Sequence, residues 1–310
     1  MVRWVVVGVG DISTKRVLPA LQAEPRSTLY GVVSRDPEKG RAHAARVWTS
    51  LDQALLDPQV DAVYIATPVF LHAPLSLAAM RAGRHVLCEK PMAMNYQEAQ
   101  DMVRVARETG MKFGVAYYRR FYPKLLRARD LLASGAIGQP VFAELTCHHW
   151  FTARDGRRAW LLDPAQAGGG PLYDIASHRI DLLNFLFGRP LRVSGHLSNA
   201  VHRFAVEDCA TVLLDYESGV RGCVDVRWHS KVERDECRFR GTDGELNLTP
   251  LNDPTLVTPA GVEQHALPAN PHLPLIENFV AAVLDNQPLV SSGETALLTD
   301  AATHAALHRP

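Results

Sequence analysis

A glycine turn close to the start of the sequence constrains the fold more than any other feature. Gly8-Val9-Gly10 directly follows an apolar run, Trp4–Val7, and precedes a helix-like segment, Arg16–Ala23. The first glycine permits a tight turn, the second lets a ligand approach the backbone, and the start of a helix offers free N–H groups to phosphate. Ser13 is small enough for the helix to pack closely on the strand. The turn therefore predicts a dinucleotide site at Gly8, Gly10, Asp11 and Ile12.

The first part of the chain repeats this alternation of apolar runs and helical segments. Further apolar runs occupy residues 29–33, 62–66, 85–88 and 112–116, and helix-like segments occupy residues 37–46, 71–82 and 96–108. Continuous apolar runs are typical of parallel strands that helices cover on both faces. We therefore predict a doubly wound α/β domain, a Rossmann domain, over residues 1–121.

The pattern changes after Pro123. Helices are expected over residues 124–133 and, more strongly, over Pro171–Leu186. Short runs, several of them alternating, occupy residues 141–147, 193–199, 210–216, 222–228 and 236–240. Alternation and short turns indicate a mostly antiparallel sheet. We predict an α+β domain over residues 122–310, and we expect its sheet to expose an apolar face that a homodimer or homotetramer would cover.

Length and composition exclude several classes of protein. The 310 residues exceed what one core usually organises, and 33 Lys and Arg balance 33 Asp and Glu. A net charge of zero gives no electrostatic drive toward nucleic acid or an anionic membrane, and no stretch approaches the roughly 18 apolar residues of a membrane span. The five cysteines contain no C-x-x-C pair, which argues against a disulfide framework and a zinc site. We expect a soluble, cytoplasmic protein with no bound metal.

The end of the second predicted strand bears on the choice of dinucleotide. A site for NAD would carry a carboxylate about 20 residues after the glycines. Ser34 and Arg35 lie there, and a hydroxyl beside a guanidinium suits the 2′-phosphate of NADP. Asp36 is the rival, but Asp36-Pro37-Glu38 is typical of a helix N-cap followed by proline and an acidic first turn. The sequence therefore favours NADP(H) over NAD(H).

Three further motifs carry groups suited to chemistry. Thr67-Pro68 ends one predicted strand and is followed by His72, while Glu89-Lys90-Pro91 ends the next. Ligands of open α/β sheets bind at the carboxyl ends of strands. The glycine run Gly168–Gly170 precedes a helix on which Asp174 and His178, four residues apart, share a face.

In combination these motifs resemble the Gfo/Idh/MocA family of nicotinamide-dependent oxidoreductases. The resemblance extends over essentially the whole chain: G-x-G, A-T-P with its trailing histidine, A-G-x-H-V-x-x-E-K-P, and G-G-G-x-L-x-D-x-x-x-H occur in order. Two positions depart from the family pattern. Val69 replaces a common asparagine and Ala176 a frequent glycine, and neither change removes a reacting group.

The resemblance implies a role for each motif. Lys90 corresponds to the catalytic lysine, His178 to the principal proton shuttle, and Asp174 to a residue that binds or orients the substrate. Histidine suits a proton shuttle because its usual pKa of about 6.5 lies near neutral pH. Glu89 would position Lys90 or the ribose of the nicotinamide. The remaining implied cofactor contacts are Thr67, Pro68 and His72, and for His72 a bond to the backbone at the start of its helix is an equal alternative.

Substrate contacts are predicted more loosely. Tyr118, Arg119 and Arg120 follow the sixth strand, which would place them near the cleft. Trp150 and Trp160 could stack on a sugar, and an arginine could bind a carboxylate; a surface or packing role stays open for each. The candidate arginines are Arg154, Arg157 and Arg158. Adjacent strand residues face opposite ways, so His148-His149 is a poor chelating pair.

The sequence thus predicts an enzyme that transfers a hydride between NADP(H) or NAD(H) and a sugar, polyol or related secondary alcohol. Two alternatives stay open at this point. One is an NAD-dependent glycosidase that recycles a bound nicotinamide. The other is a catalytically silent ligand sensor, which the retention of Lys90, Asp174 and His178 argues against.

Overall fold

A computed structural model describes residues 1–153 and 158–308, which form two compact units. The first unit comprises residues 1–118 together with residues 268–297, and the second comprises the other described residues. Segment 268–297 thus packs with a part of the chain that is distant from it in sequence. The predicted domain boundary between residues 121 and 122 stays a prediction.

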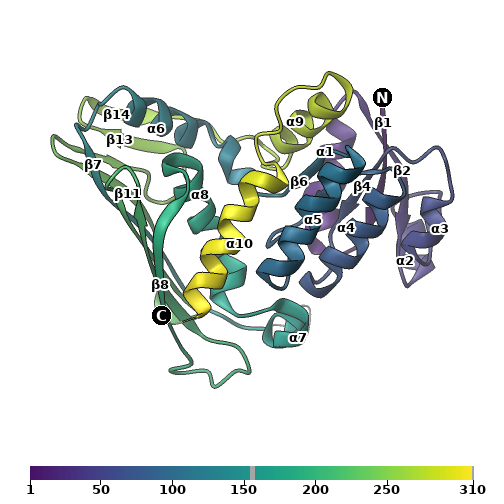
Figure 1. Cartoon of the computed structure of the whole chain (residues 1–310), viewed down its shortest axis with the longest axis horizontal. Coiled ribbons are helices and arrows are strands. Elements are labelled where there is room, and N and C mark those ends of the chain that lie inside the picture. Colours follow the sequence, from purple (N-terminus) through teal and green to yellow (C-terminus); the bar gives the residue numbers. More distant parts are fainter. Residues whose placement is uncertain (154–157, 309–310) are drawn as a thin grey trace. The chain divides into compact units, whose positions relative to one another are not determined.

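Six parallel strands form the sheet of the first unit (Figure 1), in the order β3-β2-β1-β4-β5-β6. The strands are β1 (Val2–Val7), β2 (Ser27–Val33), β3 (Val47–Trp48), β4 (Ala62–Ile65), β5 (His85–Cys88) and β6 (Phe113–Val115). The chain order reverses at β1, which lies between β2 and β4, and ligands of open α/β sheets bind at such a switch point. The predicted doubly wound fold is confirmed.

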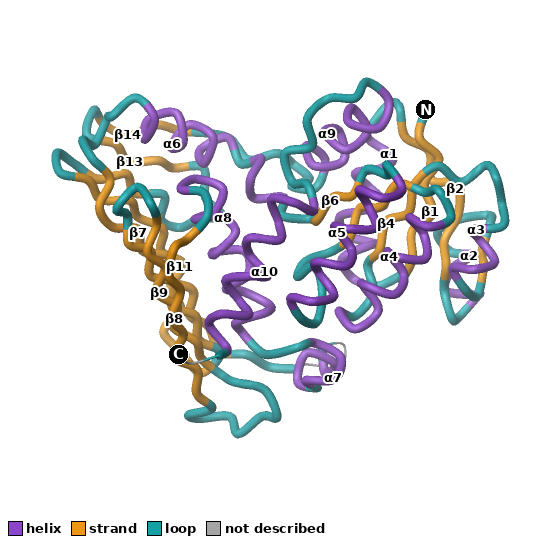
Figure 2. Tube along the Cα trace, viewed as in Figure 1, coloured by secondary structure: helices purple, strands orange, loops and turns teal. Residues whose placement is uncertain are grey.

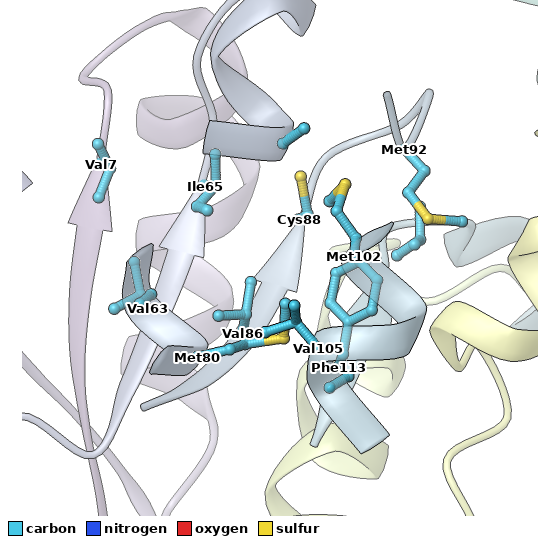
Figure 3. Packing of buried hydrophobic residues seen from close by; sticks show 14 of the residues in the cluster. Val7, Val63, Ile65, Met80, Val86, Cys88, Met92, Met102, Val105 and Phe113 are labelled. Carbon is cyan, nitrogen blue, oxygen red and sulfur yellow. The ribbon is translucent and has the colours of Figure 1, made fainter. Parts of the chain in front are cut away.

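Helices cover both faces of this sheet. They are η1 (Ser13–Val17), α1 (Leu18–Ala23), α2 (Pro37–Arg41), α3 (Leu51–Leu55), α4 (His72–Arg81), α5 (Tyr96–Thr109) and α9 (Leu273–Leu284). On one face, Ile65 and Cys88 pack with Met102 in a fully buried cluster (Figure 3). On the other, the rings of Trp4 and Phe279 lie 5.2 Å apart, so α9 packs against β1. Burial on both faces explains why the strands are apolar throughout.

The second unit contains an eight-stranded sheet in the order β14-β13-β12-β11-β7-β10-β9-β8 (Figure 2). The strands are β7 (Pro140–Trp150), β8 (Pro190–Ser198), β9 (Cys209–Tyr216), β10 (Arg221–Arg227), β11 (His229–Gly241), β12 (Glu245–Asn247), β13 (Thr255–Thr258) and β14 (Gly261–Gln264). Only the β7–β10 pairing is parallel, which confirms the expected mostly antiparallel sheet.

The helices of the second unit include the one that carries Asp174 and His178. They are η3 (Tyr118–Phe121), which follows from the first unit, α6 (Pro123–Ala133), η5 (Ala159–Leu162), α7 (Pro164–Ala167), η6 (Leu172–Ala176) and α8 (Ser177–Phe187). The final helix α10 (Gly293–Leu307) begins in the first unit and continues into the second from residue 298. The π-helical turn η6 continues directly into α8, whose first eight residues are all buried. α9 and α10 were absent from the sequence-based prediction. None of the described helices is both long and apolar enough to span a membrane.

The two faces of the second sheet differ in polarity. Val212 and Val224 lie on the buried face. The opposite face carries Leu213, 42% exposed, but also Asp225, which accepts hydrogen bonds from His148 and Thr211 at 2.6 Å each. The expectation of an apolar open face is therefore wrong: this face mixes apolar side chains with a polar network.

Candidate active site

The glycine turn after β1 has the geometry that a dinucleotide needs. Gly8 has φ +93°, and a Cβ there would lie 2.6 Å from the carbonyl oxygen of Ala66. A Cβ on Gly10 would meet nothing within 4 Å. The Ser13 hydroxyl donates to the Gly8 carbonyl and closes the turn. Gly8 is therefore required by the packing of β1 on β4, while Gly10 leaves open space at the start of a helix, which fits an approaching phosphate.

The residues after β2 include the predicted N-cap, Asp36. The Asp36 carboxylate accepts from the backbone N–H groups of Glu38 and Lys39 at 3.1 and 3.3 Å, so it caps α2. The Ser34 hydroxyl donates to the Asp36 carbonyl at 2.7 Å. Arg35 is exposed at the same edge of the sheet.

The Thr67-Pro68 segment after β4 is tied to the segment after β5 by His72. The two ring nitrogens of His72 lie 2.8 Å from the Pro91 carbonyl and 2.9 Å from the Thr67 carbonyl. Burial lowers the pKa of His72, and a neutral ring can donate to only one of the two carbonyls. The Thr67 hydroxyl oxygen is buried and has no hydrogen-bond partner among the described residues, so it is available to a bound group.

A buried carboxylate, Glu89, fixes the backbone in front of Lys90. Its Oε1 accepts from the Tyr64 hydroxyl at 2.7 Å and from Nε2 of His272 at 3.4 Å, and its Oε2 accepts from the Lys90 N–H at 3.3 Å. Burial disfavours the charge, but the partners, His272 first, hold the Glu89 pKa below its usual value. The bond between Lys90 and Pro91 is cis. Both oxygens of Glu89 thus accept hydrogen bonds within the first unit, one of them from the backbone of Lys90.

The glycine run of the second unit is required by close packing. A Cβ on Gly168 or Gly169 would lie 2.6 or 2.5 Å from the ring of Tyr173, and one on Gly170 would lie 2.1 Å from the Glu207 carbonyl oxygen. Oε1 of Glu207 accepts from the Leu172 N–H at 3.0 Å, at the start of η6. Glu207 therefore anchors the helix that carries the predicted proton shuttle.

Asp174 and His178 lie on η6 and α8. Asp174 is an ion-pair partner of Arg158, with Oδ2 and Nη2 2.8 Å apart, and the Arg158 guanidinium also lies over the ring of Phe151. His178 is 7% exposed. The negative charge of Asp174 also acts on His149, whose pKa is lowered mainly by burial. Arg158, one of three arginines considered from the sequence, is thus placed beside Asp174.

Of the other predicted substrate residues, Tyr118 belongs to the first unit, and Arg119 and Trp160 belong to the second. Tyr118 stacks on His272 within the first unit, with ring centroids 4.8 Å apart. Arg119 follows it in η3. Trp160 packs, partly buried, against the cluster around Trp228. Arg154 and Arg157 lie outside the described residues.

The suggestion that Arg120 contacts substrate is wrong. Arg120 is 1% exposed and forms a two-point ion pair with Asp181, with Nε–Oδ2 at 2.9 Å and Nη2–Oδ1 at 2.5 Å. Its guanidinium is therefore committed to the interior of the second unit.

Among the described residues, one group of possible metal ligands is close together. Ligand atoms of Asp208, Cys209 and His229 lie within 4.8 Å of one another. Asp208, however, accepts from the backbone N–H groups of residues 200–202 and from His229, which hold its pKa to about 2. These bonds occupy the carboxylate and indicate that it anchors a loop.

The structure brings together most of the predicted cofactor residues within the first unit. The turn at Gly8 and Gly10, Thr67-Pro68 and Lys90 follow the neighbouring parallel strands β1, β4 and β5. Asp11 and Ile12 are exposed in the first turn, and Asp11 pairs with Lys15. Sequence reasoning missed two residues that contact the predicted motifs: His272, which bonds Glu89, and Glu207, which bonds Leu172. His272 directly precedes an apolar helical pattern, but nothing local in sequence links it to Glu89.

Comparison with known proteins finds a family match in each of the two units. Residues 2–117 match the model "Oxidoreductase family, NAD-binding Rossmann fold", and residues 125–247 match "GFO/IDH/MocA C-terminal domain". The 1,5-anhydro-D-fructose reductase of Ensifer adhaerens is 31% identical over 95% of this chain and 92% of its own.

Two solved structures show the same fold with different cofactors. GenD2 from gentamicin A biosynthesis, in complex with NAD, is 27% identical with a TM-score of 0.85, covering 99% of this chain and 93% of its own. KijD10, a 3-ketoreductase from Actinomadura kijaniata in complex with NADP, is 26% identical with a TM-score of 0.86, covering 99% and 97%.

Proposed function

Because the chain belongs to the GFO/IDH/MocA family of oxidoreductases, whose Rossmann domain binds NAD, we propose that it oxidises or reduces a sugar, a polyol or a related secondary alcohol or ketone. The reductase name of the Ensifer adhaerens relative supports this substrate class. It does not favour the glycosidase or sensor alternatives.

One observation carries the proposal. Three motifs, the Gly8–Ser13 turn, Thr67-Pro68 and Glu89-Lys90, end three adjacent parallel strands at one edge of one sheet. A dinucleotide on that turn would extend along this edge toward Lys90. The open space at Gly10 would accommodate a phosphate of the dinucleotide, and the buried Thr67 hydroxyl, which has no partner among the described residues, could form a hydrogen bond with it.

In the proposed reaction, each site residue has a separate role at the substrate oxygen. The nicotinamide, when bound, supplies or accepts the hydride. The Lys90 ammonium donates a hydrogen bond to the substrate oxygen and polarises the carbonyl, and in the reverse direction the neutral amine of Lys90 accepts the hydroxyl proton. His178 exchanges that proton. Asp174 orients the substrate hydroxyl, and Arg158 holds the Asp174 carboxylate in place through their ion pair.

We further propose that NADP(H) is preferred over NAD(H). The carboxylate that would suit an unphosphorylated ribose, Asp36, caps α2, while Ser34 and the exposed Arg35 remain at the strand end. Arg35→Ala is expected to lower kcat/KM with NADPH about tenfold or more and to leave the value with NADH within twofold. Equal losses with both cofactors would contradict the preference.

We also propose that the eight-stranded sheet forms the interface of a homodimer or homotetramer. Its open face carries Leu213 beside the polar network of His148 and Asp225, a mixture that suits an interface with hydrogen bonds. Light scattering after size-exclusion chromatography tests this, and Leu213→Asp should shift the protein toward monomer. The cytoplasmic location stays a prediction.

The proposed activity is tested with a panel of sugars, polyols and their ketones, each assayed with NADP(H) and NAD(H). Turnover is followed by nicotinamide absorbance. Lys90→Ala is expected to lower kcat by about a hundredfold or more and to leave the cofactor Kd within twofold. Undiminished turnover in this variant would rule out the role of Lys90.

A further inference from the structure

The charge of Glu89 is stabilised by a residue from a distant part of the chain. His272, 183 positions further on, precedes α9 and is 1% exposed. Its Nε2 faces Oε1 of Glu89, and its Nδ1 has no hydrogen-bond partner among the described residues. Because a carboxylate only accepts, the proton of this bond belongs to His272. Glu89 is therefore the polar group that orients the His272 ring.

Packing fixes the ring on its other side. Tyr118 stacks on His272 with an interplanar angle of 29°, and Tyr64 donates to the same carboxylate oxygen from β4. We call Tyr64, Glu89 and His272 the Glu89 clamp. All members of the clamp belong to the first unit, together with Lys90.

The clamp acts on the backbone at one specific point. The second oxygen of Glu89 accepts from the Lys90 N–H, and on the other side of Lys90 the Pro91 carbonyl contacts His72. Lys90 is thus held from both sides by buried polar groups. We propose that His272 is a positioning residue for the oxidoreductase reaction, which holds the ionised Glu89 against the backbone of Lys90 and so fixes the direction of the lysine side chain. This inference rests on the proposed role of Lys90.

The proposal implies a pH effect that packing alone would not produce. The charged and titratable groups around Glu89 are Tyr64 on β4, Lys90 beside it, His272 before α9 and, at longer range, His72 on α4. His272 is the foremost of the partners that lower the Glu89 pKa against the effect of burial. In a variant without the His272 donor, burial raises the Glu89 pKa. As the pH falls, Glu89 is therefore protonated, and loses its hydrogen bond from Lys90, at a higher pH in the variant than in the wild type.

Two substitutions of His272 separate hydrogen bonding from bulk. His272→Leu removes the donor, and we expect kcat to fall about tenfold or more, with the cofactor Kd within twofold. The acid limb of the kcat profile should move to higher pH by about one unit. His272→Gln offers an amide N–H to Glu89 and should restore most of both effects. His265→Leu is the matched control, because His265 bonds Glu263 at 2.8 Å in the second unit and should leave both readouts unchanged.

A second readout needs neither substrate nor cofactor. In the cofactor-free protein, the difference in Tm between wild type and His272→Leu should grow as pH rises above 4.5, because Glu89 ionises easily only in the wild type. In a Glu89→Gln background this pH dependence should vanish. If the leucine variant does not fold, His272→Asn, whose amide is shorter, takes its place with the same expectations.

The possible failures are distinguishable. A wild-type kcat and pH profile in His272→Leu, with Lys90→Ala inactive, would overturn the positioning role and leave the proposed function intact. A pH-dependent Tm difference that persists in the Glu89→Gln background would also overturn it. Full turnover in Lys90→Ala would instead rule out the role of Lys90, and absence of turnover by the wild type with every member of the panel would remove the proposed function. In both cases the Tm measurement would still report on the Glu89 clamp.

Discussion

Glu89 in the first unit and Glu207 in the second do the same task under opposite electrostatic conditions. Each accepts a backbone N–H close to predicted reacting groups: Glu89 from Lys90, and Glu207 from Leu172, two residues before Asp174. The pKa of Glu89 is lowered by its partners, His272 first, whereas that of Glu207 is raised by burial. Comparing them shows that side-chain donors can reverse the direction in which burial alone moves the pKa of an enclosed carboxylate.

The largest stability effect is expected at Glu89. Glu89→Gln replaces an acceptor that faces three donors with an amide whose N–H₂ must oppose at least one of them. We expect the free energy of unfolding to fall by about 2–3 kcal/mol, as measured by chemical denaturation. Glu263→Gln, which removes a partly exposed ion pair with Arg127, is the control and should cost less. Equal losses of unfolding free energy in the two variants would show that the Glu89 clamp stabilises the protein no more than a partly exposed ion pair does.

The effect at Glu207 should be smaller and should depend on the substituent. Glu207→Ala removes the acceptor at the start of η6, and we expect a loss of about 1–2 kcal/mol, similar to that of a helix cap. Glu207→Gln keeps one carbonyl acceptor and removes the cost of burying a charge, so its stability should lie within about 0.5 kcal/mol of wild type. Thermal and chemical unfolding of the two variants check this. A glutamine variant as unstable as the alanine variant would contradict the comparison.

The two glutamates should also give opposite pH dependences. The lowered pKa of Glu89 contributes stability that is present above pH 4.5 and is lost as the pH falls through its folded-state value. The raised pKa of Glu207 contributes stability that is present below pH 4.5 and is lost as the pH rises. The free energy of unfolding of the wild type minus that of Glu89→Gln should therefore increase with pH. The same difference taken against Glu207→Gln should decrease with pH. Slopes of the same sign would refute the assignment.

The smallest effect is expected at Arg158. Its guanidinium is half exposed, so Arg158→Gln should change the free energy of unfolding by less than about 0.5 kcal/mol. Because Arg158 holds the Asp174 carboxylate, the KM of the substrate should change more than its kcat. Steady-state kinetics beside a denaturant titration give both values. A stability loss as large as that of Glu207→Ala would show that this pair is structural.

Local features of this protein were predictable and long-range pairings were not. The Asp36 cap depends on residues within a few positions, and the spacing of Gly8 and Gly10 and the proline after Gly170 are also local signals, so these sequence patterns sufficed. The glycine run was recognised, but its partner Glu207 lies 35 residues from Leu172. His272 reaches Glu89 only because α9 packs on the first sheet, and α9 itself was not predicted.

A double-substitution cycle between Lys90 and His178 tests most directly the proposed oxidoreductase reaction. The kcat values of Lys90→Ala, His178→Ala and the double variant are compared with that of the wild type, with cofactor Kd measured for each. We predict that the double variant loses little more activity than the more impaired single variant, because both groups act on the same substrate oxygen. Losses that multiply independently would contradict the account.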